Sequence, residues 1–309
     1  MSELEEVTSG LVFPEGPVAM ADGSVVLVEM LGERLTRVAP DGTRETIAEV
    51  PGGPNGLAIG PDGAGYLCNN GGVFSPLDLG GLLLPGPFDR DRYIGGRIQR
   101  VDLDTGEVTD LYTECDGNPL RAPNDLVFDE HGGFYFTDHG HAEHDRRIEH
   151  LTGLYYARPD GSEIREVAFP VSSPNGIGLS PDGSTVYWAE TMHGRVMQRR
   201  VSAPGELAPP DNPLGDCLAG LPGMQYLDSL AVDSDGNVCV ATLLNGGVTT
   251  ISPAGEIVEF LATGDPITTN ICFGGPDGTT AYITLSATGR LVRTEWPRPG
   301  APLHCGAAA

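Results

Sequence analysis

The most constraining feature of this chain is a segment that recurs six times. Each copy begins with a polar residue, continues as an apolar run, and reaches the middle of a turn of the form x-Asp-Gly, or a close variant, seven positions later. A second run rich in Val, Tyr, Phe and Thr follows, a pattern typical of a β-hairpin. The six polar residues are Glu15, Asn55, Asn124, Asn175, Asp228 and Asn270.

The spacing of the copies predicts the fold. Successive copies start roughly 40 to 70 residues apart, which suits a four-stranded propeller blade and exceeds a solenoid turn. Further strands follow the hairpins, as in GRIQRVDLD and EVTDLYTE after the second copy. We therefore expect an all-β fold, a six-bladed β-propeller with four antiparallel strands per blade, forming a single domain over residues 1–309.

Closure of the ring is the next expectation. The sixth unit offers three strands before the chain turns into PRPGAPLHCGAAA. The N-terminal segment LEEVTSGL can supply the fourth strand, so that the two ends of the chain pair and leave no open edge. A C-terminal strand beyond Trp296 is the weaker alternative because of its prolines.

Charge and composition exclude several classes of protein. A formal net charge of −25 with scattered Lys and Arg argues against a nucleic-acid partner. No apolar run is long enough to span a membrane, and the first residues are acidic where a secretory signal would be basic and then apolar, so we expect a cytoplasmic protein. The six cysteines lack CxxC or CxxH spacing, which favours buried thiols over disulfides or a zinc site.

The six repeat-start residues share one register, and this has a chemical consequence. The first strand of each propeller blade lies nearest the axis, so these side chains would form a ring at one end of the central channel. All six offer oxygen, two are anionic, and none is imidazole or sulfur. Such a set suits hard divalent cations, Ca²⁺ above all, with Mg²⁺ and Mn²⁺ also admitted. Alternatively, Asn and Asp here merely end strands by bonding to their own backbone.

Several of these motifs together resemble a known family. They are Phe-Pro-Glu-Gly-Pro near the N-terminus, Pro-Asn-Asp, Ser-Pro-Asn-Gly-Ile-Gly-Leu-Ser-Pro-Asp-Gly and Asp-x-Leu-Ala-Val-Asp-x-Asp-Gly-Asn. The chain resembles the regucalcin and gluconolactonase family of six-bladed propellers over essentially its whole length. The resemblance implies a divalent metal, Ca²⁺ or sometimes Zn²⁺ or Mn²⁺, held by residues matching Glu15, Asn175 and Asp228, with Asn124 meeting metal or substrate. One departure is Leu227-Asp228-Ser229, where the family commonly has Pro-Asp-Gly.

The resemblance also implies a reaction, the hydrolysis of a small lactone such as a sugar-acid lactone. A metal at the channel mouth would polarise the lactone carbonyl and stabilise the developing oxyanion. We expect Asp228 to act as general base or to orient the water, in addition to binding the metal, and Glu15 to be a ligand only. Asn55, Asn124, Asn270 and His139 are expected to meet the substrate.

Other functions stay open on sequence grounds. The related diisopropylfluorophosphatase uses the same Glu, Asn, Asn, Asp set, so a phosphotriester is a second substrate class. Blade four also resembles the strictosidine synthase and paraoxonase branch, whose condensing enzymes need no metal. A noncatalytic propeller that binds a protein partner, or a calcium buffer, is the third class.

Two long loops are expected to decide the substrate. Residues 71–95 are unusually apolar for a loop, and a lid, packing on a neighbouring blade and a subunit contact are all open interpretations. Residues 139–150 carry four histidines without zinc-motif regularity, and His139 either faces the channel mouth or belongs to a solvated loop. Glu190 and His193 occupy the equivalent turn in the fourth unit. Oligomeric state is open.

Overall fold

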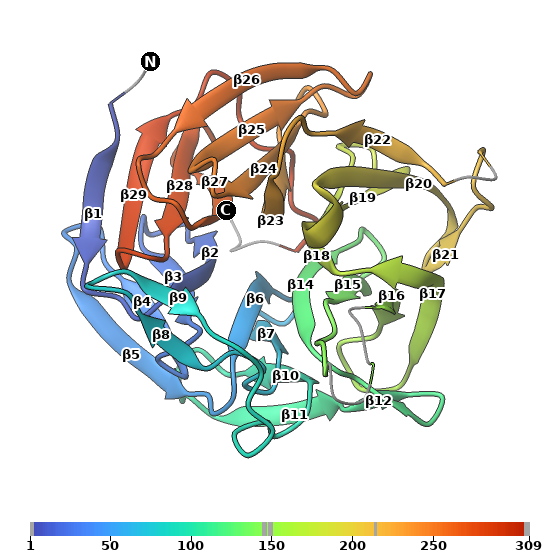
Figure 1. Ribbon diagram of the computed structural model, residues 1–309, viewed down its shortest axis with the longest axis horizontal. Helices are drawn as coiled ribbons and strands as arrows, with labels where there is room; N and C mark the ends of the chain where they lie inside the picture. Colours follow the sequence, from blue (N-terminus) through green and yellow to red (C-terminus); the bar gives the residue numbers. More distant parts are fainter. Residues whose placement is uncertain (1–2, 144–146, 148–150, 213–214, 306–309) are drawn as a thin grey trace.

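Six antiparallel sheets surround a central axis in the computed structural model, which describes residues 3–143, 147, 151–212 and 215–305 (Figure 1). The predicted six-bladed β-propeller is confirmed. The strand nearest the axis in each blade begins at or just before a repeat-start residue. These innermost strands are β2 (Pro14–Ala19), β6 (Pro54–Ile59), β14 (Pro123–Phe128), β18 (Pro174–Leu179), β23 (Tyr226–Val232) and β27 (Thr268–Gly274).

The other strands follow outward in chain order in blades one to five, and in blade six the outermost strand is β1 from the start of the chain. The second strands are β3 (Val25–Glu29), β7 (Gly65–Asn69), β15 (Phe134–Asp138), β19 (Thr185–Glu190), β24 (Val238–Leu243) and β28 (Thr280–Leu285). The third strands are β4 (Arg34–Val38), β10 (Arg97–Val101), β16 (Leu151–Ala157), β20 (Arg195–Ala203), β25 (Gly247–Ile251) and β29 (Arg290–Glu295). The outermost strands are β5 (Arg44–Glu49), β11 (Val108–Tyr112), β17 (Ile164–Ser172), β22 (Cys217–Gly220), β26 (Ile257–Ala262) and β1 (Glu5–Ser9).

The recurring x-Asp-Gly turns join the first and second strands of every blade. Their glycines all have positive φ, between 67° and 83°, a region that glycine enters without steric cost. The residue before the glycine also contributes, since Asp22 Oδ1 accepts a hydrogen bond from the Ser24 N–H at 2.9 Å. These turns require particular residues, and this requirement explains why the repeat can be recognised in the sequence. The six glycines are Gly23, Gly63, Gly132, Gly183, Gly236 and Gly278.

The ring closes as predicted, because β1 pairs with β29 as the outermost strand of the sixth blade. Glu5 lies opposite Arg293 in this pairing, and Arg293 Nε donates to Glu5 Oε2 at 2.9 Å. The alternative of a C-terminal closing strand is wrong for the described residues: beyond Trp296 the chain bridges to blade five, where Ala301 N donates to Val232 O at 2.8 Å. The prediction of one domain over residues 1–309 includes ends that are not described, and it stays a prediction.

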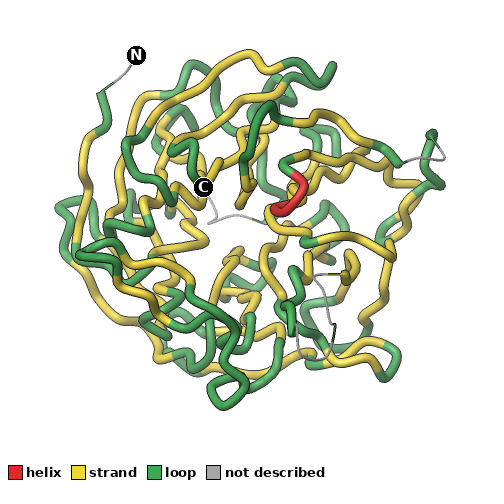
Figure 2. The backbone as a smooth tube through the Cα atoms, viewed as in Figure 1, coloured by secondary structure: helices red, strands yellow, loops and turns green. Residues whose placement is uncertain are grey.

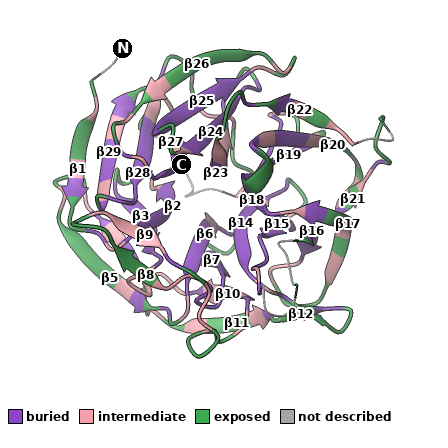
Figure 3. Cartoon of the chain, viewed as in Figure 1, coloured by how far each residue is buried: buried purple, intermediate pink, exposed green. Residues whose placement is uncertain are grey.

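Burial decreases from the axis outward (Figure 3). The first and second strands are almost wholly buried, whereas the outermost β5 and β26 are mostly exposed. All six cysteines are free: Cys68, Cys115 and Cys239 are buried, Cys272 and Cys305 are partly buried, and Cys217 is exposed. Within the described residues, no helix has the length and apolarity needed to cross a bilayer.

Five short strands and one 3₁₀ turn decorate the blades. The turn, η2 (Thr191–His193), is the single helical segment of the described residues (Figure 2). The insertion at residues 71–95 lies between β7 and β10, and residues 139–143 of the histidine-rich loop follow β15 at the equivalent place in blade three. Both therefore lie at the channel end where the innermost strands begin. The short strands are β8 (Pro76–Asp78), β9 (Leu83–Pro85), β12 (Glu114–Cys115), β13 (Asn118–Pro119) and β21 (Glu206–Leu207).

Candidate active site

Each repeat-start residue lies at an irregularity of its strand pair. The register between first and second strands shifts between Glu15 and Val18 and at the corresponding residues of blades two to five, whereas in blade six it shifts earlier, between Thr268 and Asn270. A β-bulge of this kind bends the strand and redirects a side chain. Proline precedes the polar residue in four of the blades, where the missing N–H costs no ladder hydrogen bond. The bulge and the preceding proline together direct these side chains toward the axis.

Glycine after the repeat-start residue allows neighbouring blades to approach one another. A Cβ added at Gly56 would lie 2.6 Å from the Asn124 carbonyl oxygen, and one added at Gly176 would lie 2.5 Å from the Leu230 nitrogen. The Asn-Gly pairs at residues 55 and 175 therefore serve blade packing. The structure thus gives these glycines a reason that is separate from strand termination.

The mouth cavity, as we call it, opens at the end of the channel where the innermost strands begin. It has a volume of about 930 Å³ and is lined by five of the six repeat-start residues. These five are Glu15, Asn55, Asn124, Asn175 and Asp228, and His139 also lines the cavity. The structure thus brings these predicted site residues together from five blades.

Three amide oxygens of this ring have no hydrogen-bond partner among the described residues. Asn55 Oδ1, Asn124 Oδ1 and Asn175 Oδ1 are all buried and unpaired. The Asn175 amide nitrogen donates to Thr191 Oγ1 at 3.1 Å, and that of Asn55 points to Met30 Sδ at 3.7 Å. Because buried polar atoms are rarely left unpaired, three such oxygens lining one cavity indicate acceptors prepared for a ligand.

The two ring carboxylates, Glu15 and Asp228, are buried, and neither forms an ion pair with a described residue. Burial, followed by repulsion from Asp228 and Asp125, holds the pKa of Glu15 well above its ordinary value. Burial likewise raises the pKa of Asp228 to about 7, and the charge of Asp125 adds to this effect. Among the described residues, no three His, Cys, Asp or Glu side chains form a metal cluster, so a cation here would need the amide oxygens.

A further layer of buried polar residues fixes the loops that lead into the ring. Glu29, at the end of β3, accepts from the Val12 N–H at 2.6 Å and binds Arg34 and Thr36. Asp138, at the end of β15, accepts from the N–H groups of Arg121 and Ala122 at 2.6 and 2.7 Å. These carboxylates hold the chain just before Glu15 and Asn124.

One side of the mouth cavity is apolar. We call Phe13, Met30, Phe74, Leu243 and Ile267 the apolar wall, since all five line the cavity and belong to one hydrophobic cluster. Leu82, Leu83 and Leu84 of the 71–95 insertion pack behind it, and Leu83 N donates to Ala287 O at 2.9 Å in the sixth blade. The insertion therefore packs on neighbouring blades and, through Phe74 and Phe88, also lines the cavity.

Another part of the cavity lining is polar, and there Glu143 pairs with both Arg90 and His141. Arg90 forms an ion pair with Glu143, whose Oε1 lies 3.1 Å from His141 Nε2. Phe88 stacks on His141 with ring centroids 4.3 Å apart. Burial lowers the pKa of His141, so its ring is neutral at pH 7. The 71–95 insertion and the histidine loop are thereby joined across the cavity rim.

Two predicted positions differ from the ring. Asn270 does not line the mouth cavity; its Oδ1 accepts from the Ile271 N–H at 2.8 Å and its Nδ2 donates to Glu15 Oε2 at 3.3 Å. A substrate contact for Asn270 stays a prediction, and its observed partner is Glu15. His139 is buried on the cavity, with Nδ1 3.1 Å from the Gly140 carbonyl oxygen.

The remaining histidines and Glu190 contribute less to the cavity. Glu190 binds Arg195 at 2.7 Å, and His193 is half-exposed beside it. Their neighbours Thr191 and Met192 line the cavity instead. His144 and His150 of the predicted histidine loop lie outside the described residues.

Sequence reasoning placed Phe74, Arg90, His141 and Glu143 within the two loops expected to decide the substrate, without giving them individual roles. It did not identify Phe13, Met30, Leu243, Ile267 or Tyr226. A positional signal for some of them exists, because Phe13 and Tyr226 stand two residues before Glu15 and Asp228, while Met30 and Leu243 stand at or just after the ends of second strands. Those are the positions at which a blade reaches the channel mouth. No signal in the sequence shows which loop residues meet across the axis.

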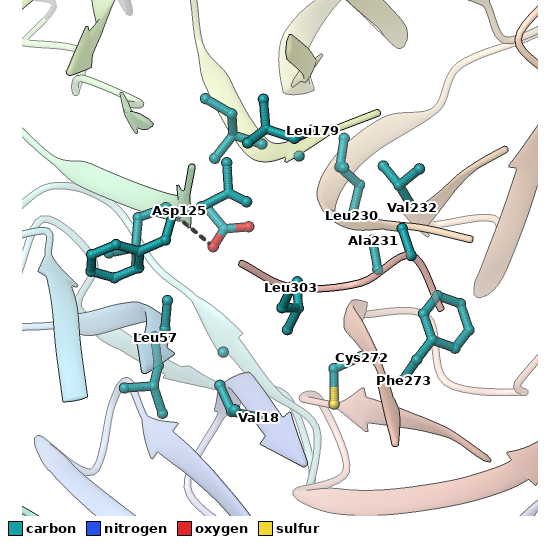
Figure 4. Close-up of a pocket in the computed structure, with 18 of the residues that line it drawn as sticks. Val18, Leu57, Asp125, Leu179, Leu230, Ala231, Val232, Cys272, Phe273 and Leu303 are labelled. Atoms are coloured by element: carbon teal, nitrogen blue, oxygen red, sulfur yellow. Dashed lines mark hydrogen bonds between the residues drawn. The ribbon is translucent and has the colours of Figure 1, made fainter. Parts of the chain in front are cut away.

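A second, smaller cavity lies farther along the channel (Figure 4). We call it the rear cavity; its volume is about 150 Å³, and its walls are mostly aliphatic residues of the innermost strands with Leu303 of the C-terminal tail. Its buried acid is Asp125, whose pKa burial raises to about 7. Five of the six repeat-start residues therefore line the mouth cavity, whereas the rear cavity is lined mostly by apolar side chains.

The fold and the site define a class: a six-bladed propeller with acid and amide oxygens converging at one end of its channel. Over residues 13–287 the chain matches the family described as SMP-30/Gluconolactonase/LRE-like region, and it belongs to this family. A gluconolactonase of Zymomonas mobilis is 26% identical over 94% of this chain and 81% of its own length. The lactonase drp35 of Staphylococcus haemolyticus is 28% identical over 79% of this chain and 69% of its own length.

Solved structures share the architecture. A gluconolactonase from Xanthomonas campestris superposes with a TM-score of 0.75 at 21% identity, covering 96% of this chain and 90% of that protein. A calcium-binding protein, regucalcin, from Agrobacterium tumefaciens gives a TM-score of 0.72 at 17% identity, covering 95% of both chains. At these identities the superpositions establish the fold.

Proposed function

We propose that this protein is a metal-dependent lactonase, which hydrolyses the ester bond of a lactone at the mouth cavity. Family membership and the lactonase names of its relatives support the reaction type. The unpaired oxygens of Asn55, Asn124 and Asn175 beside two buried acids are the observation that carries the metal. A cytoplasmic location remains part of this proposal.

The residues present fit a hard divalent cation. Glu15, Asn124, Asn175 and Asp228 would hold it, with Asn55 available as a further oxygen. Two carboxylates and several amide oxygens suit Ca²⁺ first, while Mg²⁺, Mn²⁺ or Zn²⁺ would accept part of the set. A cation would also pair the buried charges of Glu15 and Asp228, which otherwise repel one another.

The protein side chains would divide the work of hydrolysis. When bound, the metal supplies Lewis acidity for the lactone carbonyl and for the negative charge that develops on its oxygen. Asp228 would accept the proton of the attacking water through a carboxylate oxygen and return it to the departing ring oxygen. Asn270 would keep the Glu15 carboxylate oriented through its 3.3 Å hydrogen bond, and Asn55 and His139 would contact the substrate.

Metal dependence can be tested by measuring acid release from a lactone panel with the metal-free protein and after adding Ca²⁺, Mg²⁺, Mn²⁺ or Zn²⁺ separately. We expect turnover only with metal, and loss of at least about a hundredfold in kcat for Asp228→Asn. Exposed Asp211→Asn is a matched control, since Asp211 lies far from the channel on the loop after β21 and pairs with Arg200. Full turnover by metal-free protein would contradict metal dependence, and no turnover of any lactone would contradict the activity.

A further inference from the structure

The apolar wall of the mouth cavity carries an inference about the substrate that rests on the proposed lactonase activity. The wall combines side chains from three blades and the insertion, and Phe13, Met30 and Ile267 are at most 8% exposed. Phe13 also adopts a φ of 58°, which is uncommon for a bulky residue. Backbone strain of this kind is retained where surrounding structure enforces it and is concentrated at functional sites.

Several polar groups of the cavity, by contrast, are engaged with other protein groups, and the unpaired Oδ1 atoms of Asn55, Asn124 and Asn175 belong to the ring that would bind the metal and the lactone group. Arg90 and His141 both bind Glu143, His139 Nδ1 lies at the Gly140 carbonyl, and Thr191 Oγ1 accepts from Asn175. A polyhydroxylated lactone would have to compete for these groups or bury its hydroxyls against the apolar wall. Burying an unpaired hydroxyl is costly, whereas burying a hydrocarbon is favourable.

The volume of the mouth cavity also favours a lactone with an apolar substituent. Ligand cavities generally measure about 300 to 1,000 Å³, so a cavity of about 930 Å³ has room for a lactone ring and a sizeable substituent. The ring oxygens fix where the lactone group would bind, next to Glu15 and Asp228. A substituent on the lactone ring would then extend onto the apolar wall.

We propose that the protein selects lactones carrying an alkyl or aryl substituent, with Phe74 of the 71–95 insertion as a residue that determines this specificity. Each methylene buried against the wall should raise kcat/KM by up to about fourfold. A sugar lactone of the same ring size should be the poorer substrate because its hydroxyls meet hydrocarbon.

The test compares γ-valerolactone, γ-heptalactone and γ-nonalactone with glucono-1,4-lactone, which has the same five-membered ring, using Ca²⁺-loaded full-length protein. We expect kcat/KM to rise with chain length, by about tenfold or more from the first to the last alkyl lactone, and glucono-1,4-lactone to lie below γ-nonalactone. Phe74→Ala should reduce the ratio between γ-nonalactone and γ-valerolactone about fivefold. Phe260→Ala is the matched control, because Phe260 lies on the outermost strand β26, and it should leave that ratio unchanged.

Calorimetric binding of the matching alkyl lactams provides a readout that does not need turnover. If longer lactams bind more tightly and Phe74→Ala weakens that binding, the specificity is supported even when no lactone is hydrolysed. The absence of any hydrolysis would then overturn only the lactonase proposal. A preference for glucono-1,4-lactone with no chain-length dependence in either assay would overturn the specificity and leave the lactonase proposal intact. An equal effect of Phe260→Ala would also overturn the role of Phe74.

Discussion

Asp228→Asn should stabilise the metal-free protein and abolish its stabilisation by Ca²⁺. Asp228 is buried beside two other acids, and its pKa rises from 3.8 to about 7 because of burial and then repulsion from Asp125. Asparagine has nearly the same shape and carries no charge. The substitution therefore removes the cost of the buried charge together with one ligand of the proposed site.

The magnitude follows from the shift in pKa. A group whose pKa is higher in the folded state favours folding at low pH and loses that advantage as pH rises through the folded value. A rise in pKa of about three units means that the charged carboxylate costs the folded state about 4 kcal/mol, and this cost is reached in full only above pH 7. Metal-free Asp228→Asn should thus exceed the wild type in free energy of unfolding by up to about 4 kcal/mol at pH 8, and by about 1 to 2 kcal/mol at pH 5.

Urea denaturation at pH 5 and pH 8, with chelator and with excess Ca²⁺, measures both effects. The wild type should gain about 2.7 kcal/mol at a Ca²⁺ concentration one hundred times its dissociation constant, and Asp228→Asn should gain little. The reasoning would be refuted by a metal-free variant less stable than the wild type at pH 8, or by an equal gain from Ca²⁺ in both proteins.

Three further predictions concern the scaffold. Glu29→Gln should lower the free energy of unfolding by about 2 to 3 kcal/mol at pH 7. Burial alone would raise the pKa of Glu29, but the hydrogen bonds from Arg34, Thr36 and the Val12 N–H lower it overall. The stability that the charged carboxylate provides is therefore lost as pH falls. Urea titrations at pH 7 and pH 3 should therefore show the variant and wild type converging at pH 3, and a constant difference would contradict the assignment. Gly56→Ala should destabilise by about 1 to 3 kcal/mol in thermal unfolding, because its Cβ would lie 2.6 Å from the Asn124 carbonyl oxygen. Gly220→Ala is the matched control, because Gly220 also has no positive φ and a Cβ there meets no atom within 4 Å. An equal loss in both variants would count against the contact. Deleting residues 1–9 removes β1 and opens the β29 edge, so light scattering should detect association of the truncated protein, and a monomeric, equally stable product would contradict closure through β1.

The sequence allowed the innermost strands to be predicted because their signals are local. The apolar run and the x-Asp-Gly turn are read within about ten residues, and one glycine with positive φ marks each copy. The common register of Glu15 and Asp228 follows from the same repeat. These features needed no knowledge of contacts between distant parts of the chain.

The cavity above the ring could not be predicted in the same way. Phe13, Phe74 and Ile267 come from different blades and loops, and their meeting depends on the arrangement of the whole ring. Asn270 shares the repeat register with the other ring residues, yet its amide bonds to its own strand and to Glu15. The repeat predicts the position of a residue on its strand, whereas the hydrogen bonds of its side chain decide the direction in which that side chain points.

The central claim is that a cation held by the channel ring enables lactone hydrolysis. Its most direct test is the initial rate of hydrolysis of γ-nonalactone by metal-free protein, measured as Ca²⁺ is added in steps from zero to several equivalents. We predict no turnover without metal and a rate that reaches its plateau at one equivalent per chain. A rate that is already maximal in the metal-free protein would contradict the claim.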